Sequence, residues 1–254
     1  MAATKTGPRC SVLQFREKKL DAKDYAGAIV DFDKVIEIDT EDADAYNNRG
    51  LAKFSLGESE TASGNAKKAQ RLYKAAIEDI TRSIQIDSED ADAYNNRGLA
   101  KFSLGKSKST RGKVKKVKKT QRFYEAAIAD YTQAIKMNPK YAEAYKNQAK
   151  VKCKLGDIES ARDDAEKAQR LYHDGITDYD KYIQLNNPED VNESAADLAS
   201  EKVKDSTVRV MSWAGGFYSG SGFFVKEDKV ATNVHVVAQS GPVFVKLKGS
   251  VSAY

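Results

Sequence analysis

Apolar side chains recur every three or four positions in several stretches of the chain. The clearest stretch runs from Tyr73 through Ala76, Ile77, Ile80 and Ile84. This spacing places the five side chains on one face of an α-helix, with polar and charged residues on the other face. The pattern predicts amphipathic helices, each of which needs a neighbouring helix to cover its apolar face.

The helical pattern is repeated along the chain. IDTEDADAYNNRGLAKFSLG at 38–57 recurs 48 residues later as IDSEDADAYNNRGLAKFSLG at 86–105, and a weaker copy covers 141–156. A second helical segment alternates with the first, and its copies begin at Tyr25, Tyr73, Tyr124 and Tyr172. Each repeat therefore consists of two helices, and successive pairs can bury their apolar faces by stacking.

Residues that favour helix ends lie between these segments. Gly57, Gly105 and Gly156 are predicted to end the first helix of each pair. Asp-rich stretches at 39–42 and 87–90 are predicted to stop the second helix and to cap the next one, since Asp side chains accept hydrogen bonds from free backbone N–H groups.

The sequence AYNNRGLAKFSLG followed by YxxAIxDxxxxI resembles a tetratricopeptide repeat over residues 8–188. In that family a small Gly in the first helix lies against an Ala in the second. The matching positions are Gly50 and Gly98 in first helices and Ala28, Ala76 and Ala127 in second helices, with Ala149 replacing the Gly in the third copy. The resemblance implies a mainly α fold, an α-solenoid of helical hairpins.

The repeats are longer than the family period of about 34 residues. The additional residues of the first copy, ESETASGN and AKKAQR, are predicted to form a polar loop followed by a backward extension of the second helix. Extended second helices are therefore expected. In the last copy two frames remain open, because either GDIESARDDAEKAQ after Gly156 or the segment around Tyr172 can be the second helix.

Composition changes after residue 188. A polar linker is predicted at 189–206, and a Gly- and Val-rich tract with strand alternation at 207–254. GSGFFV followed by ATNVHVV resembles the start of trypsin-like serine proteases of the high-temperature-requirement type, whose fold is a β-barrel. The resemblance implies that His235 is the general base of a catalytic triad.

The protease resemblance is incomplete. A triad also needs a carboxylate and a nucleophilic Ser after the His, but no acidic residue follows Asp228. We therefore expect the chain as given not to be an active protease, and its enzyme status is open. It is either a fragment of a repeat-containing serine endopeptidase, with the Asp and Ser beyond Tyr254, or the product of a truncated gene.

The first helices carry the candidate partner-binding residues, which are Asn47, Asn48, Leu51, Asn95, Asn96 and Leu99. Amide side chains both donate and accept hydrogen bonds, so they can hold the backbone of an extended peptide. The equally weighted alternative is that these Asn residues, with Arg49 and Arg97, pair between neighbouring helices. Lys146 and Lys150 in the third copy would favour an acidic peptide, although a solvated helix face is the preferred interpretation there.

Charge adds one further candidate. The formal net charge of +5 is concentrated in the run 106–122, which contains nine Lys or Arg and no acid. Such a run can neutralise phosphates, but it lacks the interleaved aromatic residues that stack on bases, so nucleic-acid binding is not favoured. A loop leading into a solvated helix start is the preferred interpretation.

The remaining features narrow the class of protein. Cys10 and Cys153 are far apart and without neighbouring His, so no metal or cofactor site is predicted and both are expected to be packed side chains. No stretch is apolar enough to span a membrane, and the N-terminus lacks a leader, which predicts a cytoplasmic protein. The sequence thus predicts an adaptor that binds a peptide or protein partner, in an oligomeric state that the sequence leaves open.

Overall fold

The computed structural model describes residues 24–108 and 114–186, with side chains at 24–107 and 117–186, and the backbone of five strands between residues 207 and 253. The chain divides into two compact units, Met1–Pro139 and Lys140–Tyr254. The domain bounds 8–188, 189–206 and 207–254 stay predictions.

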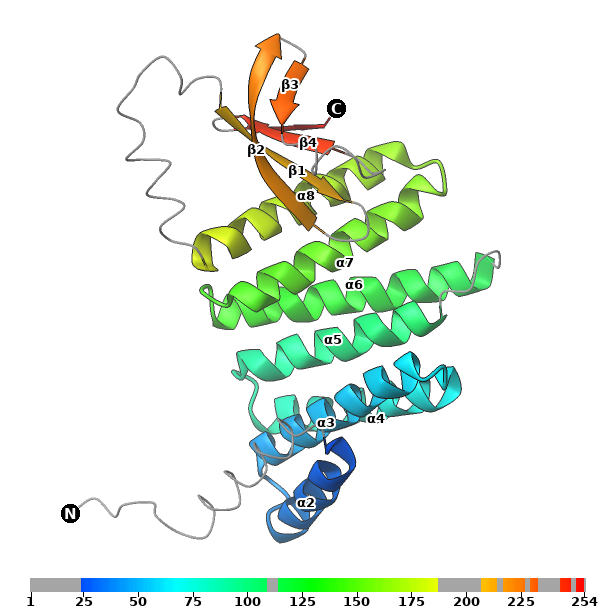
Figure 1. Ribbon diagram of the computed structural model, residues 1–254. Coiled ribbons are helices and arrows are strands. Elements are labelled where there is room, and N and C mark those ends of the chain that lie inside the picture. The colour runs from blue at the N-terminus through cyan, green and yellow to red at the C-terminus, as the bar shows by residue number, and fades with distance from the viewer. Residues whose placement is uncertain are drawn as a thin grey trace, which may run out of the picture. The chain divides into compact units, whose positions relative to one another are not determined.

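The first unit is a set of α-helices that follow one another in antiparallel hairpins (Figure 1). Its helices are α2 (Tyr25–Ile38), α3 (Ala43–Ala62), α4 (Ala66–Ile86), α5 (Ala91–Lys108) and α6 (Val114–Met137). α3 pairs with α4, α5 pairs with α6, and α4 also packs against α5. The predicted stripe of α4 forms part of the core, since Tyr73, Ala76 and Ile80 are at most 1% exposed. The helical-hairpin prediction is confirmed.

Asp side chains begin the helices as predicted. The Asp42 carboxylate accepts a hydrogen bond of 2.9 Å from the backbone N–H of Ala45 in the first turn of α3. Asp39 and Asp87 each accept a backbone N–H two residues later in the connecting turns. The bond from Ala45 satisfies a donor that the start of a helix otherwise leaves free, and the other two stabilise the turns before α3 and α5.

The prediction that three glycines end the first helices is wrong. α3 continues through Gly57 to Ala62. The glycine lies inside the helix, where its missing side chain leaves room for an aromatic ring of the next helix. A Cβ placed on Gly57 would lie 2.7 Å from a ring carbon of Tyr73. The same pairs are Gly105 with Tyr124, in a helix that ends at Lys108, and Gly156 with Tyr172, in a helix that ends at Ser160.

The prediction of a polar loop at ESETASGN is also largely wrong. Most of that segment belongs to α3, and only residues 63–65 connect it to α4. Polar contacts hold the added turns, since the Tyr73 hydroxyl donates to Glu58 Oε1 at 2.5 Å and lies 2.8 Å from Thr61 Oγ1. The extended second helices are confirmed, with 21 residues in α4 and 24 in α6. The first helices are lengthened as well.

The second unit begins with one more hairpin, α7 (Ala142–Ser160) and α8 (Ala165–Asn186). Residues 157–160 belong to α7, and Tyr172 lies in α8, which settles the frame of the last copy in favour of the longer second helix. The small residues are exchanged here, because α7 has Ala149 and α8 has Gly175. A Cβ on Gly175 would lie 3.1 Å from the Ala149 carbonyl oxygen.

Five antiparallel strands follow in the second unit. They are β1 (Thr207–Trp213), β2 (Phe217–Lys226), β3 (Lys229–Thr232), β4 (Val243–Leu247) and β5 (Ser250–Ala253), in the sheet order β3-β2-β1-β4-β5. His235, the predicted general base, lies outside the described residues, and so does Cys10. Within the described part of the chain, no helix has the length and apolar character needed to cross a bilayer.

Candidate partner-binding surfaces

A buried cluster of charges fixes the first helix of the first complete hairpin. The Arg49 guanidinium of α3 donates two hydrogen bonds, of 2.8 and 2.6 Å, to the Asp79 carboxylate of α4, and a third of 2.7 Å to Asp33 of α2. Lys53 Nζ lies 2.7 Å from Asp79 as well. The hydrogen bond to Asp79 raises the pKa of Arg49, against the opposing effect of burial. Arg49 thus ties three helices together.

The next hairpin repeats this cluster with one change. Arg97 and Lys101 of α5 contact Asp130 of α6 at 2.8 and 2.6 Å. The position of Asp33 is occupied by Thr81, whose hydroxyl lies 3.4 Å from Arg97. Burial lowers the pKa of Lys101, although Asp130 acts in the opposite direction. Both hairpins therefore use these cations for structure.

The hairpin of the second unit lacks the arginine. Gln148 stands in its place, and Asp178 pairs with Lys152 at 2.7 Å. Burial raises the pKa of Asp178 to about 6, and nearby Asp174 adds to this effect, while Lys152 opposes it. The folded chain therefore holds a proton on Asp178 more tightly than the unfolded chain does.

We expect the stability of the Asp178→Asn variant, relative to that of the parent, to increase as pH rises. A carboxyl whose folded pKa lies above its ordinary value of 3.8 loses its contribution to stability between pH 4 and pH 6. The difference in the free energy of unfolding between variant and parent should thus shift by about 2 kcal/mol between pH 4 and pH 7. Urea unfolding at both pH values measures it, and an unchanged difference would contradict the raised pKa.

The predicted asparagine residues are only partly available to a partner. Asn47 and Asn95 are 8% and 5% exposed. Asn96 of α5 donates a hydrogen bond of 3.1 Å to the Asn47 side-chain oxygen of α3, which is the pairing between helices that the alternative interpretation described. Asn48 and the two leucines, Leu51 and Leu99, are half-buried and lie on the same two helices.

The predicted lysines of α7 lie near carboxylates of their own helix. Lys146 Nζ is 3.3 Å from Glu143 and 5.0 Å from the centre of the Tyr182 ring. Lys154, one turn after Lys150, pairs with Asp157 at 3.0 Å. Lys150 itself is exposed. Lys150 is therefore the more exposed of the two predicted lysines, Lys146 and Lys150.

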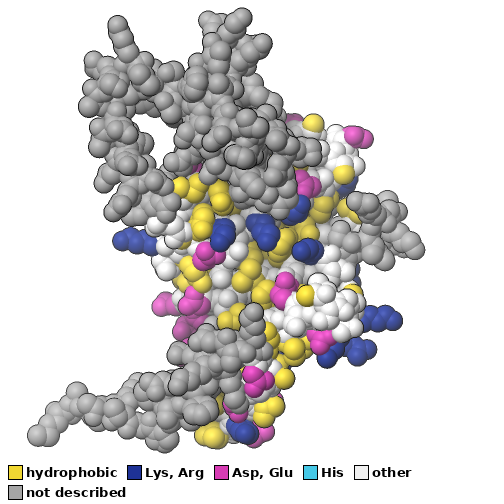
Figure 2. All heavy atoms as spheres, viewed as in Figure 1, with side chains coloured by type: hydrophobic (Ala, Val, Ile, Leu, Met, Phe, Trp, Pro, Cys, Tyr) yellow, Lys and Arg dark blue, Asp and Glu magenta, His cyan; other side chains and the backbone are white. Residues whose placement is uncertain are grey.

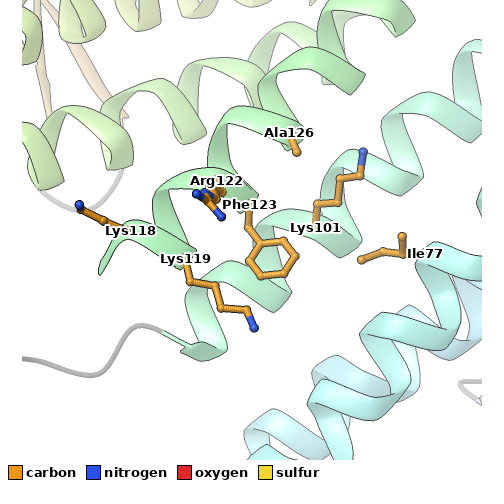
Figure 3. Close-up of a pocket in the computed structure, with 7 residues that line it drawn as sticks. All are labelled: Ile77, Lys101, Lys118, Lys119, Arg122, Phe123 and Ala126. Carbon is orange, nitrogen blue, oxygen red and sulfur yellow. The ribbon is translucent and has the colours of Figure 1, made fainter. Parts of the chain in front are cut away.

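A groove that the sequence did not predict lies between α4, α5 and α6. Its volume is about 540 Å³, and it is lined by Ile77, Lys101, Lys118, Lys119, Arg122, Phe123 and Ala126. Figure 3 shows Phe123 and Lys119 extending from α6, with Ile77 on α4 across from them. Figure 2 shows apolar side chains exposed among Lys and Arg side chains on the face in view. The sequence signal was the basic run 106–122, but Ile77, which faces it across the groove, comes from α4.

Metal-binding groups do not gather in the described part of the chain, where no cluster of three or more His, Cys, Asp or Glu has a geometry suited to an ion. Cys153 is fully buried, as predicted for a packed side chain, and burial raises its pKa. A neutral, inaccessible thiol is a poor nucleophile and a poor ligand.

Comparisons with known proteins identify the repeats. A family model described as TPR repeat matches residues 19–57, and one described as Tetratricopeptide repeat matches residues 117–188. The chain therefore contains tetratricopeptide repeats, as the resemblance predicted, and this fold is typical of protein-protein interaction adaptors. No curated protein sequence matches the chain significantly.

Several solved structures are similar to the chain at low identity. MamA from Desulfovibrio magneticus RS-1 is 18% identical, with 73% of this chain and 79% of that chain covered and a TM-score of 0.44. A thermophilic TPR protein of Thermus thermophilus is 14% identical, with 74% and 98% covered and a TM-score of 0.44. YrrB, described as a TPR protein with an unusual peptide-binding site, is 15% identical, with 74% and 91% covered and a TM-score of 0.26.

Proposed function

We propose that the chain is an adaptor that binds a peptide or protein partner through a surface of α3 and α5. This surface, the first-helix face, consists of Asn48, Leu51, Asn96 and Leu99. The observation that carries the proposal is that two leucines at the same register of consecutive repeats are half-buried and remain outside the core. The partly exposed leucines can be buried by a bound peptide, which stabilises the complex. The asparagine amides beside them can form hydrogen bonds to the peptide backbone.

The neighbouring contacts preorganise the first-helix face. Asn96 is held by Asn47, and Arg49 fixes α3 against its neighbours through Asp33 and Asp79. Side chains held in this way lose little further conformational freedom on binding, which favours affinity. Because the two copies share one sequence, the face offers the same contacts twice, and an extended segment with repeated side chains would match it.

The proposal is tested by titrating the chain with a peptide selected on it from a random displayed library. We expect Leu51→Asp with Leu99→Asp to weaken binding of that peptide by about tenfold or more, because both apolar contacts are lost. Val30→Asp is the control, since Val30 is an exposed apolar residue of α2 outside the face. Equal affinities of the parent and the double variant would contradict the proposal.

A second candidate function is that of a repeat-bearing serine endopeptidase with His235 as general base. The observation that favours it is the run GSGFFV followed by ATNVHVV, in the order of the trypsin-like family. In this case the repeats would recruit the substrate. The coding DNA beyond Tyr254 tests this candidate: an in-frame Asp followed by a Ser in a GxSxG-type segment would support it, and a reading frame without them would contradict it.

A further inference from the structure

The groove between α4, α5 and α6 combines an apolar floor with a row of exposed cations. Ile77, Phe123 and Ala126 form the floor, and exposed Lys118, Lys119 and Arg122 line it from α6. Among the residues that the structure describes, none forms an ion pair with these three cations, whereas Lys101 at the groove is paired with Asp130. No ion pair within the described structure therefore accounts for these three charges.

A related segment occurs three times, in the first turns of each extended second helix. The copies read AKKAQRLY at 66–73, VKKTQRFY at 117–124 and AEKAQRLY at 165–172. In the first copy Lys68 pairs with Glu60 at 2.6 Å. In the third, Lys167 pairs with Glu159 at 2.7 Å. The end of the preceding first helix therefore supplies a carboxylate to the basic segment in both outer copies.

The middle copy has the opposite charge at those positions. Aligned on FSLG, the places of Glu58 and Glu60 are occupied by Lys106 and Lys108 in α5. An acid at this position forms an ion pair with the segment in the outer copies and a Lys cannot, so folding does not favour this exchange. The exchange leaves the segment without its acid in one hairpin, which is the hairpin that also has the groove. An anionic group of a binding partner would replace the missing carboxylate.

We propose that this groove binds an acidic segment of a partner protein that also carries an apolar side chain. Carboxylates of the segment contact Lys118, Lys119 and Arg122, and the apolar side chain enters between Ile77 and Phe123. The volume of about 540 Å³ is that of a site for a few side chains. Charge-assisted hydrogen bonds over an apolar floor give both strength and orientation.

The observations favour a peptide over a nucleic acid. Phe123 is half-buried and packs against the cluster of Ala69, Tyr73 and Leu104, so its ring is part of the floor and is not a free platform for a base. Ile77 and Ala126 on the floor suit an aliphatic side chain better than a phosphate or a sugar. This surface is distinct from the first-helix face, and the proposal holds whether or not that face binds a partner.

The test uses the full chain and a fluorescent peptide of Glu and Asp residues around a central Leu-Phe pair. Lys118→Glu with Arg122→Glu is expected to weaken binding by about tenfold, because two attractive charges become repulsive. The matched control is Lys67→Glu with Arg71→Glu, at the equivalent exposed positions of α4 and with the same change in net charge. It should change the affinity by about twofold or less. A peptide with Ser-Ser in place of Leu-Phe should bind about fivefold more weakly to the parent.

Three results would overturn the proposal. Equal weakening by the two double variants would show a diffuse charge effect. Equal affinities of the Leu-Phe and Ser-Ser peptides would show that the floor is not used. Tighter binding of a single-stranded RNA of the same charge, with the same dependence on Lys118 and Arg122, would assign the groove to nucleic acid. Circular dichroism of both double variants confirms that each is folded, since all four positions are exposed.

Discussion

Replacing Asp79 by Ala is expected to lower the free energy of unfolding by about 3 kcal/mol, because it leaves two partly buried cations without their main partner. The Asp79 side chain is 9% exposed, and Arg49 and Lys53, which it binds, are 16% and 19% exposed. Asp33 remains as the other partner of Arg49 but is itself 46% exposed, so it compensates little. Urea unfolding measures the loss.

The control for Asp79 is an ion pair of similar length at the surface. Glu41 lies 2.6 Å from Arg82, with side chains that are 66% and 41% exposed. Glu41→Ala should change the free energy of unfolding by about 0.5 kcal/mol or less, since water screens such pairs. If Asp79→Ala and Glu41→Ala cost the same, the buried cluster would not hold the hairpins together.

Replacing Gly98 by Ala is expected to destabilise the first unit by about 2 kcal/mol. A Cβ on Gly98 would lie 2.7 Å from a ring carbon of Tyr131, which is fully buried in α6. Helix propensity alone predicts the opposite effect, an increase of about 1 kcal/mol in the free energy of unfolding. Urea unfolding gives the sign, and the near-ultraviolet circular dichroism of tyrosine reports whether the ring is displaced.

The second unit provides the matched comparison. Ala149 takes the place of the glycine there, and the corresponding ring, Tyr179, is half-buried and lies 5.4 Å from the Tyr182 ring. Ala149→Gly should therefore cost about 2 kcal/mol, from the helix-propensity difference of about 1 kcal/mol and the loss of a buried methyl group. A stabilising Gly98→Ala would contradict the interpretation that the glycine exists to admit the ring.

Periodicity was sufficient to predict the helices and their buried faces. The stripe through Tyr73, Ala76 and Ile80 is buried in the structure, and the Asp caps lie where the sequence placed them. The apolar spacing and the Asp residues before the helices are both local signals, since each can be recognised within one helix or one turn of the sequence. The repeated segments then made the pairing of helices predictable as well.

The wrong predictions concern residues whose role depends on a different helix. Gly57 looked like a helix end because glycine often ends helices, but its function is to face Tyr73, which is 16 positions away in sequence. The polar insert looked like a loop because its side chains are hydrophilic. In the structure, Glu58 and Thr61 lie one helical turn apart in α3, and both contact the Tyr73 hydroxyl.

The candidate surfaces were predictable only in part. The sequence identified the first-helix residues and the basic run, but it could not show that Asn47 is occupied by Asn96 or that Ile77 of α4 lies beside Phe123 of α6. These relations need the packing of three helices at once. The substitution of acids by Lys106 and Lys108 was visible in the sequence, but its meaning depended on the ion pairs of the outer copies.

Leucine-methyl nuclear magnetic resonance of the chain with a library-selected peptide tests the adaptor function most directly. We predict that the methyl signals of Leu51 and Leu99, which are half-buried on the first-helix face, shift on saturation with the peptide. The signal of Leu104, which is 2% exposed in the core, should stay in place. Saturable binding that leaves both Leu51 and Leu99 unchanged would contradict the account, because the partner would then bind elsewhere.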